Sequence, residues 1–214
     1  MATSETPEED FALFSSVADV MRELTQHRSN YVPHETVACD IVLDSRGRLK
    51  SATGLMSFVV EKEMLNAGGN LFGGYVPSLT DSLTTVLLLS CNLRTERTWV
   101  PSMSTSLNVD FLDGVSLGKT VFVEIHINRI GKNVAFTDAD FYRGHPSEGA
   151  LLYKARHQVV LLRGSPNMEN NVRKNLPKHQ EAIDRALEAY DLIEEQRLAA
   201  DGKSPDASTQ QARL

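Results

Sequence analysis

One stretch of the chain, LNAGGNLFGGYVPSLTDSLTTVLLLSCN (residues 65–92), decides the fold. Its second part, from Tyr75 to Asn92, is apolar around almost its whole circumference, which is typical of a helix buried inside a domain. Pro77 falls in the first turn, where proline costs little because the amides there have no partners within the helix. We therefore predict a buried helix from Tyr75 to Asn92, preceded by a glycine-rich loop.

The segments on both sides of this helix have the pattern of β-strands. Residues 37–63 contain two such segments, with a turn at Ser45 to Arg48 between them. Four more follow the helix, near residues 102–112, 119–128, 133–142 and 150–162, and glycines lie in their connections. Two strands, one buried helix and four strands predict an α+β fold, in which one antiparallel sheet curls around the helix.

Both ends of the chain are predicted to be helical. A capping box at Thr6 to Glu9 precedes an apolar stripe that includes Phe14 and Val17. Near the other end, an amphipathic pattern comprises Ile183, Leu187, Tyr190 and Ile193, and disorder is expected from Ala200 onward. The expected organisation is an N-terminal helix and linker (1–36), a central domain (37–163), and a C-terminal helix with a tail (164–214). That helix either stabilises the domain or a neighbouring subunit, or serves as a lid or partner site.

Composition restricts the classes of function. The 214-residue chain has a formal net charge of −6, which argues against a broad nucleic-acid surface but not against a small anionic ligand. Cys39 and Cys91 are too far apart in sequence for a metal-ligand motif, so we expect reduced thiols and no metal site. We also expect no membrane span and, from the acidic first ten residues, no secretory signal.

The glycine-rich loop and the helix after it carry the chemical signal. Gly73 and Gly74 let the backbone approach a ligand, and they leave amides at the positive end of the helix dipole, which suits a developing oxyanion. Asp81 lies within the apolar helix, on a narrow polar stripe with Ser78, Ser82 and Thr85. Such a stripe faces either a hydrogen-bonded network or a cleft.

Together, the residues from Asn66 to Asp81 resemble the active-site segment of hotdog-fold acyl-CoA thioesterases of the phenylacetate-degradation type. Ser104 to Phe111 resembles the following strand of these enzymes, and Arg129 to Thr137 resembles their next hairpin. The resemblance covers about Val37 to Arg163, with a weaker likeness in the first helix. It implies a hotdog fold and assembly as a homodimer or a dimer of dimers.

The resemblance also implies a reaction: hydrolysis of an acyl-CoA to the free acid and coenzyme A. Asp81 would activate water or attack the thioester carbonyl, and Ser104 would orient the water. The amide of Gly73 would polarise the carbonyl, and Asn66 would help to bind it from the other subunit. No cofactor is implied beyond the coenzyme A of the substrate.

One departure from the family pattern affects the functional prediction. Phe72 stands where relatives usually carry histidine before the glycine pair, and its ring cannot form the same hydrogen bonds. A non-catalytic acyl-CoA-binding or sensing protein is therefore the main alternative, whereas enoyl hydration would need the missing histidine. We expect Phe72 and Gly74 to contact the substrate. Arg129 and Lys132 would hold the coenzyme A phosphates, or serve only as soluble turn residues.

The end of the chain resembles a targeting signal. The last three residues are Ala212, Arg213 and Leu214, which resemble the Ser-Lys-Leu signal. An import receptor and a peroxisome or related organelle are therefore expected, with the cytoplasm as the alternative.

The six histidines form no recognisable triad or metal set. We expect surface or core roles for all six, including His157.

Overall fold

The computed structural model describes residues 8–25, 32–96 and 100–163, together with single helical positions between 181 and 195. The cap at Thr6, the tail from Ala200 and the terminal tripeptide lie outside the described residues. The targeting signal therefore stays a prediction.

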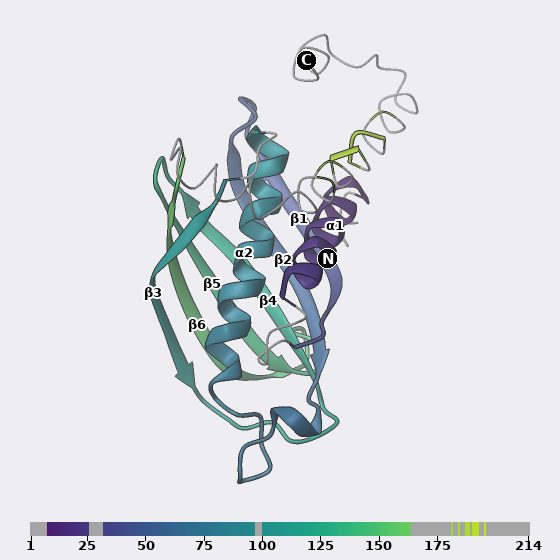
Figure 1. Cartoon of the computed structure of the whole chain (residues 1–214), viewed down its shortest axis with the longest axis vertical. Coiled ribbons are helices and arrows are strands. Elements are labelled where there is room, and N and C mark those ends of the chain that lie inside the picture. Colours follow the sequence, from purple (N-terminus) through teal and green to yellow (C-terminus); the bar gives the residue numbers. More distant parts are fainter. Residues whose placement is uncertain are drawn as a thin grey trace.

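Six strands form one antiparallel sheet in the order β1-β2-β4-β5-β6-β3. Their bounds agree closely with the predicted segments: β1 (Glu35–Leu43), β2 (Leu49–Val59), β3 (Ser102–Phe111), β4 (Thr120–Ile130), β5 (Val134–Arg143) and β6 (Ala150–Leu161). Figure 1 shows the sheet curling around one long helix. The α+β prediction is confirmed.

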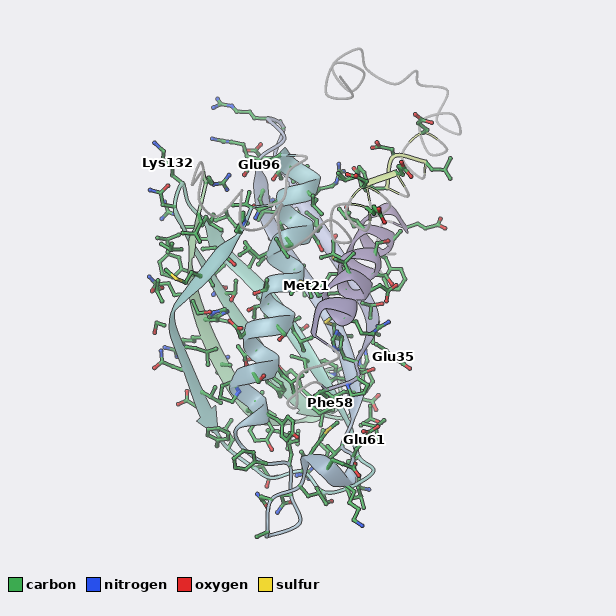
Figure 2. All side chains as sticks on the ribbon, viewed as in Figure 1. Met21, Glu35, Phe58, Glu61, Glu96 and Lys132 are labelled. Atoms are coloured by element: carbon green, nitrogen blue, oxygen red, sulfur yellow. The ribbon has the colours of Figure 1, made fainter. Side chains whose placement is uncertain are left out.

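That helix, α2 (Tyr75–Glu96), lies against the concave face of the sheet. Its apolar side chains are buried against inward-facing residues of the central strands, and side chains fill the space between the two layers (Figure 2). Burial of this apolar surface is the main force that holds helix and sheet together. The helix extends beyond the predicted end at Asn92, because Leu93 is also buried and Arg94 finds partners.

Helix α1 (Glu8–Thr25) packs beside β1 and α2. Buried Asp10 accepts a hydrogen bond from the Ile41 amide at 3.2 Å, and it pairs with Arg94 at 3.2 Å. Phe14 lies so close to Gly54 that a Cβ there would be 2.8 Å from the ring. The first helix is thus part of the domain core.

The C-terminal helical positions also contact the domain. Tyr190 is buried, and the Arg94 guanidinium lies 5.1 Å from the centre of its ring. Leu187 packs against the core, whereas Ile183 and Ile193 lie outside the described residues. In the part of the chain that the structure describes, Cys39 and Cys91 are buried free thiols, and none of the helices is long and apolar enough to cross a membrane.

Within the described residues, strand β3 forms one edge of the sheet and pairs with β6 alone. A β-bulge between Ser104 and Ser106 interrupts its alternation. Without the bulge, alternation back from Leu107 would turn Ser104 away from α2. With the bulge, Ser104 pairs with buried Val159 and joins the face that points toward the helix.

Candidate active site

The glycine-rich loop after the short helix η1 (Lys62–Met64) is held by Asn66. The Asn66 side-chain oxygen accepts hydrogen bonds from the amides of Gly68 and Asn70, at 2.9 and 3.2 Å. Gly69 has a φ of +79°, which closes the turn. Because its oxygen is used within the loop, the exposed Asn66 side chain presents its NH2 group as the available donor.

The start of α2 presents two backbone donors. The carbonyls of Phe72 and Gly73 accept from Tyr75 and Val76, but the amides of Gly73 and Gly74 have no acceptor among the described residues. They precede the first turn of α2, where the helix dipole adds partial positive charge. This arrangement suits a carbonyl oxygen that becomes negative.

Aromatic rings surround these amides. Phe72 folds back over Gly74 so closely that a Cβ there would clash with the ring, and it meets Tyr75 edge-on at 6.3 Å between centroids. Phe111 of β3 lies against Gly73, where a Cβ would be 3.2 Å from the ring. Phe72 remains 53% exposed, so its ring forms an open apolar wall beside the donors. Asn70 is the nearest polar side chain of the loop that could take the place of the missing histidine. Its side chain lies against Gly114, so it does not supply a hydrogen bond beside Gly73 and Gly74.

Asp81 lies in the second turn of α2, and its side chain is 51% exposed. The polar stripe faces the less buried side of α2, and the carboxylate is partly open to solvent. The Ser104 hydroxyl donates to Oδ1 of Asp81 at 2.6 Å, so the structure brings together the two residues that the resemblance paired. Among the described residues, the Thr85 hydroxyl donates to the Asp81 main-chain carbonyl alone, at 2.6 Å.

His157 of β6 completes this cluster, and sequence reasoning missed it. Its Nε2 lies 2.9 Å from Ser104 Oγ and 3.4 Å from Asp81 Oδ1, and its Nδ1 lies 2.7 Å from Thr84 Oγ1. The sequence pattern that could have identified His157 is the alternation of buried and exposed residues along β6. His157 occurs between Ala155 and Val159, on the strand face that is otherwise apolar and buried.

Counting hydrogens assigns the roles within the cluster. Each hydroxyl has one hydrogen, and Ser104 donates its own to Asp81. Nε2 of His157 must therefore donate to Ser104, which leaves Nδ1 of the neutral ring to accept from Thr84. Thr84 then gives up its bond to the Thr80 carbonyl, which still has its helical amide donor.

Burial lowers the pKa of His157, and the nearby Asp81 carboxylate opposes this shift only in part. The neutral imidazole is therefore favoured, in agreement with the hydrogen count. Oδ2 of Asp81 has no partner among the described residues, and the side chain is open to solvent. A water bound there would meet a carboxylate that Ser104 and His157 hold in place.

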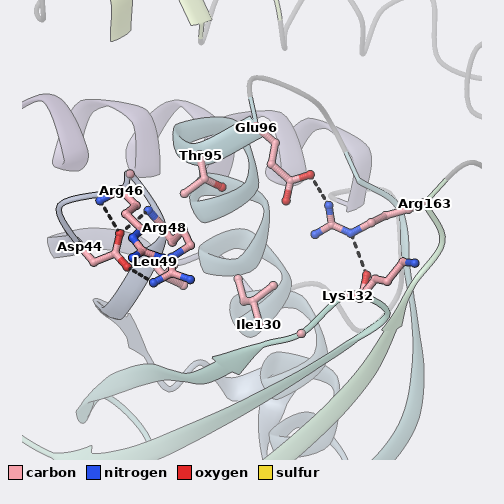
Figure 3. Close-up of a pocket in the computed structure, with 11 residues that line it drawn as sticks. Asp44, Arg46, Arg48, Leu49, Thr95, Glu96, Ile130, Lys132 and Arg163 are labelled. Carbon is pink, nitrogen blue, oxygen red and sulfur yellow. Dashed lines mark hydrogen bonds and ion pairs between the residues drawn. The ribbon is translucent and has the colours of Figure 1, made fainter.

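The two cations predicted to bind phosphate lie far from Asp81 in the same chain. Arg129 and Lys132 lie at the hairpin between β4 and β5, near the C-terminal end of α2. Lys132 lines a cavity together with Thr95, whereas Arg129 does not line it (Figure 3). Fourteen helical residues from Asp81 to Thr95 span about 21 Å. Within the described ranges, no group of three His, Cys, Asp or Glu side chains is placed to hold a metal ion.

A hotdog sheet around a buried helix, with a carboxylate and backbone donors on that helix, is typical of thioesterases. Comparisons with known proteins point to the same class. A family model described as the thioesterase superfamily matches residues 68–150. The human acyl-coenzyme A thioesterase 13 is 30% identical over 146 residues, which cover 68% of this chain and 94% of the relative. The chain therefore belongs to the thioesterase superfamily.

Solved structures show the same fold. The zebrafish thioesterase superfamily member 2 aligns with a TM-score of 0.53 at 19% identity, over 69% of this chain and 94% of that one. The Escherichia coli PaaI protein of the phenylacetic acid degradation operon aligns with a TM-score of 0.51 at 15% identity, over 69% and 95%. The predicted hotdog fold is confirmed.

Proposed function

We propose that this protein hydrolyses acyl-CoA thioesters to the free acid and coenzyme A, with Asp81 as the general base. The observation that carries the proposal is the cluster of Asp81, Ser104 and His157, which orients one carboxylate oxygen and leaves the other open. Membership of the thioesterase superfamily supports the reaction type.

The reaction balances with these groups alone. Oδ2 of Asp81 takes a proton from water as the water oxygen attacks the carbonyl carbon. The amide of Gly73 and the NH2 group of Asn66 stabilise the resulting oxyanion. The carbon–sulfur bond then breaks, and the thiolate of coenzyme A takes the proton from Asp81. Phe72 and Gly74 line the approach to the carbonyl.

One chain does not hold a complete site. Gly73 and Asp81 are eight residues apart, which corresponds to about 12 Å along a helix. A carbonyl bound at the Gly73 amide would thus be out of reach of water held by Asp81 in the same chain. We infer that the donors and the base come from two copies of the chain.

Strand β3 offers the surface for this pairing. It is a ten-residue edge strand, it carries Ser104, and Phe111 at its end contacts Gly73. Met103 and Phe111 are 57% and 55% exposed, which is unusual for a long edge strand that stays unpaired. A two-fold pairing of β3 with the same strand of a second copy would cover this edge.

A non-catalytic acyl-CoA-binding protein is the second candidate, and Phe72 favours it, because this ring gives no hydrogen bond at the helix start. The test is release of free thiol from short, medium, long and aromatic acyl-CoAs by wild-type protein and Asp81→Asn. Turnover by wild type alone supports hydrolysis. Saturable binding without turnover of any substrate would favour the binding protein.

A further inference from the structure

The glycine-rich loop rests on a second loop, the β3–β4 turn (residues 112–119). Both lie at the end of the domain where α2 begins (Figure 1). The Leu71 amide donates to the carbonyl of buried Val115 at 2.8 Å, and Asn70 forms an antiparallel bridge with Ser116. The position of the glycine-rich loop is therefore coupled to that of the turn.

Asn70 connects the turn to both proposed oxyanion donors. Its carbonyl accepts from the Asn66 amide at 2.7 Å, and its own amide donates to the Asn66 side-chain oxygen at 3.2 Å. Two residues further on, the Phe72 amide donates to the Met64 carbonyl at 2.7 Å, directly before Gly73. A shift of Asn70 would thus move the Asn66 NH2 group and the Gly73 amide together.

Backbone hydrogen bonds fix both ends of the β3–β4 turn. The Asp113 amide donates to the Leu152 carbonyl at 3.1 Å, and the Gly118 amide donates to a carbonyl after β2 at 2.8 Å. Between these ends, Gly114 has no side chain to pack, and a Cβ there would lie 3.1 Å from the Asn70 side chain. The turn therefore needs another contact at Gly114 to hold the surface on which Asn70 lies.

Arg143, at the end of β5, supplies this contact. Its Nη2 donates to Asp113 Oδ2 at 2.6 Å and to the Gly114 carbonyl at 2.7 Å. The other oxygen of Asp113 accepts from the Gly114 amide at 2.7 Å. Among the described residues, Arg143 is the one side chain from outside the turn that hydrogen-bonds to it. These bonds set the orientation of Gly114 from both sides.

The ion pair itself adds little to the fold. The side chains of Arg143 and Asp113 are 42% and 57% exposed, and exposed ion pairs contribute little to stability. We propose that Arg143 is a positioning residue for hydrolysis: it holds the β3–β4 turn against the glycine-rich loop and so places the Asn66 and Gly73 donors at the oxyanion. This role rests on the proposed function.

Kinetics of Arg143→Met and Asp113→Asn test the placement. Because small shifts of catalytic groups reduce the rate steeply, kcat for the best acyl-CoA of the panel should fall at least about tenfold in both variants. KM should change less, since the donors act chiefly on the developing oxyanion. Lys154→Met is the matched control. It removes an ion pair with Asp140 in which the lysine is 40% exposed, and it should turn over as wild type does.

Mixed dimers separate placement of the donors from a general loss of folding. Since the donors would act with Asp81 of the other copy, Arg143→Met should complement Asp81→Asn and restore about one quarter of wild-type activity. Mixed with Asn66→Ala, it should give no more than the mean of the two proteins, because both changes then affect the donors. Complementation of Asn66→Ala instead of Asp81→Asn would contradict the assigned role.

Hydrogen exchange reports on the loop without any turnover. Loss of the Arg143 contacts should speed exchange of the Leu71 amide at least about tenfold, whereas the amide of Val123 in the core should exchange as in wild type. Absence of turnover by wild type would contradict the proposed function alone, because exchange at Leu71 still shows whether Arg143 holds the loop. With an active wild type, unchanged kcat in Arg143→Met or unchanged exchange at Leu71 would overturn the proposal.

Discussion

The hydroxyl of Thr84 lies 2.7 Å from Nδ1 of His157, and it joins α2 to β6 across 73 positions of sequence. Both side chains are buried, and among the described residues Thr84 is the hydrogen-bond donor to Nδ1 of His157. Through Nε2 the same imidazole reaches Ser104, and through Ser104 it reaches Asp81. The orientation of the exposed carboxylate is thus set from inside the core.

Thr84→Val tests this connection through stability. The change keeps the shape of the side chain but leaves Nδ1 of His157 buried without a donor, which should lower the free energy of unfolding by about 1–3 kcal/mol. Denaturant unfolding measures the loss. Thr85→Val is the matched control, because its half-exposed hydroxyl bonds only a carbonyl of its own helix. Equal stability of the two variants would contradict the assigned role of Thr84.

His157 should also make stability depend on pH. Because burial lowers its pKa, the unfolded chain takes up the proton near 6.5, whereas the folded protein takes it up only at lower pH. Stability from this group is present above pH 6.5 and is lost as pH falls through the folded pKa. Unfolding free energies from pH 7.5 down to 5 should show this decline in wild type and a flatter slope in His157→Gln. An imidazole that titrates above 6.5 by NMR would refute the assignment.

Asp81→Asn should fold normally, because the side chain is half exposed, yet lose most turnover. Loss of a general base typically costs about 10² to 10⁴ in rate. The measurement is kcat for the best acyl-CoA of the panel, and Asp110→Asn, an exposed carboxylate on β3, is the control. Near-normal turnover of Asp81→Asn would remove Asp81 as the base.

Mixing two inactive variants tests whether the site is shared between copies. Asn66→Ala removes an oxyanion donor and should cost about 10² to 10³ in rate. In a mixed dimer with Asp81→Asn, one site carries both lesions and the other carries none. Co-refolding equal amounts should therefore restore about one quarter of wild-type activity, since half of the dimers are mixed. A mixture no more active than its components would place the donors and the base in one chain.

Phe72→His should preserve the fold and equal or improve hydrolysis. Phe72 is half exposed and packs over Gly74, where the smaller imidazole also fits, and the new ring adds a hydrogen-bonding group beside the Gly73 amide. Steady-state kinetics and thermal unfolding of the two proteins provide the comparison. A drop in both activity and stability would show that phenylalanine belongs to a rearranged site.

The local parts of this structure could be predicted because their signals lie within short stretches of chain. Apolar residues on all sides predict helix α2, and alternation of apolar and polar residues predicts the strands. Gly73, Gly74 and Asp81 could be singled out for the same reason, since each is unusual in its immediate neighbourhood. These patterns depend on backbone geometry that repeats every few residues.

What only the tertiary structure decided is which distant side chains meet. A bulge in β3 turns Ser104 toward α2, and the pairing of β3 with β6 sets His157 beside it. The same holds for Arg143, which reaches the β3–β4 turn from the end of β5. Strand register and bulges depend on the packing of the whole sheet, and no local pattern encodes them. For this reason Asp81 was identified from the sequence, whereas His157, which orients Ser104 beside it, was not.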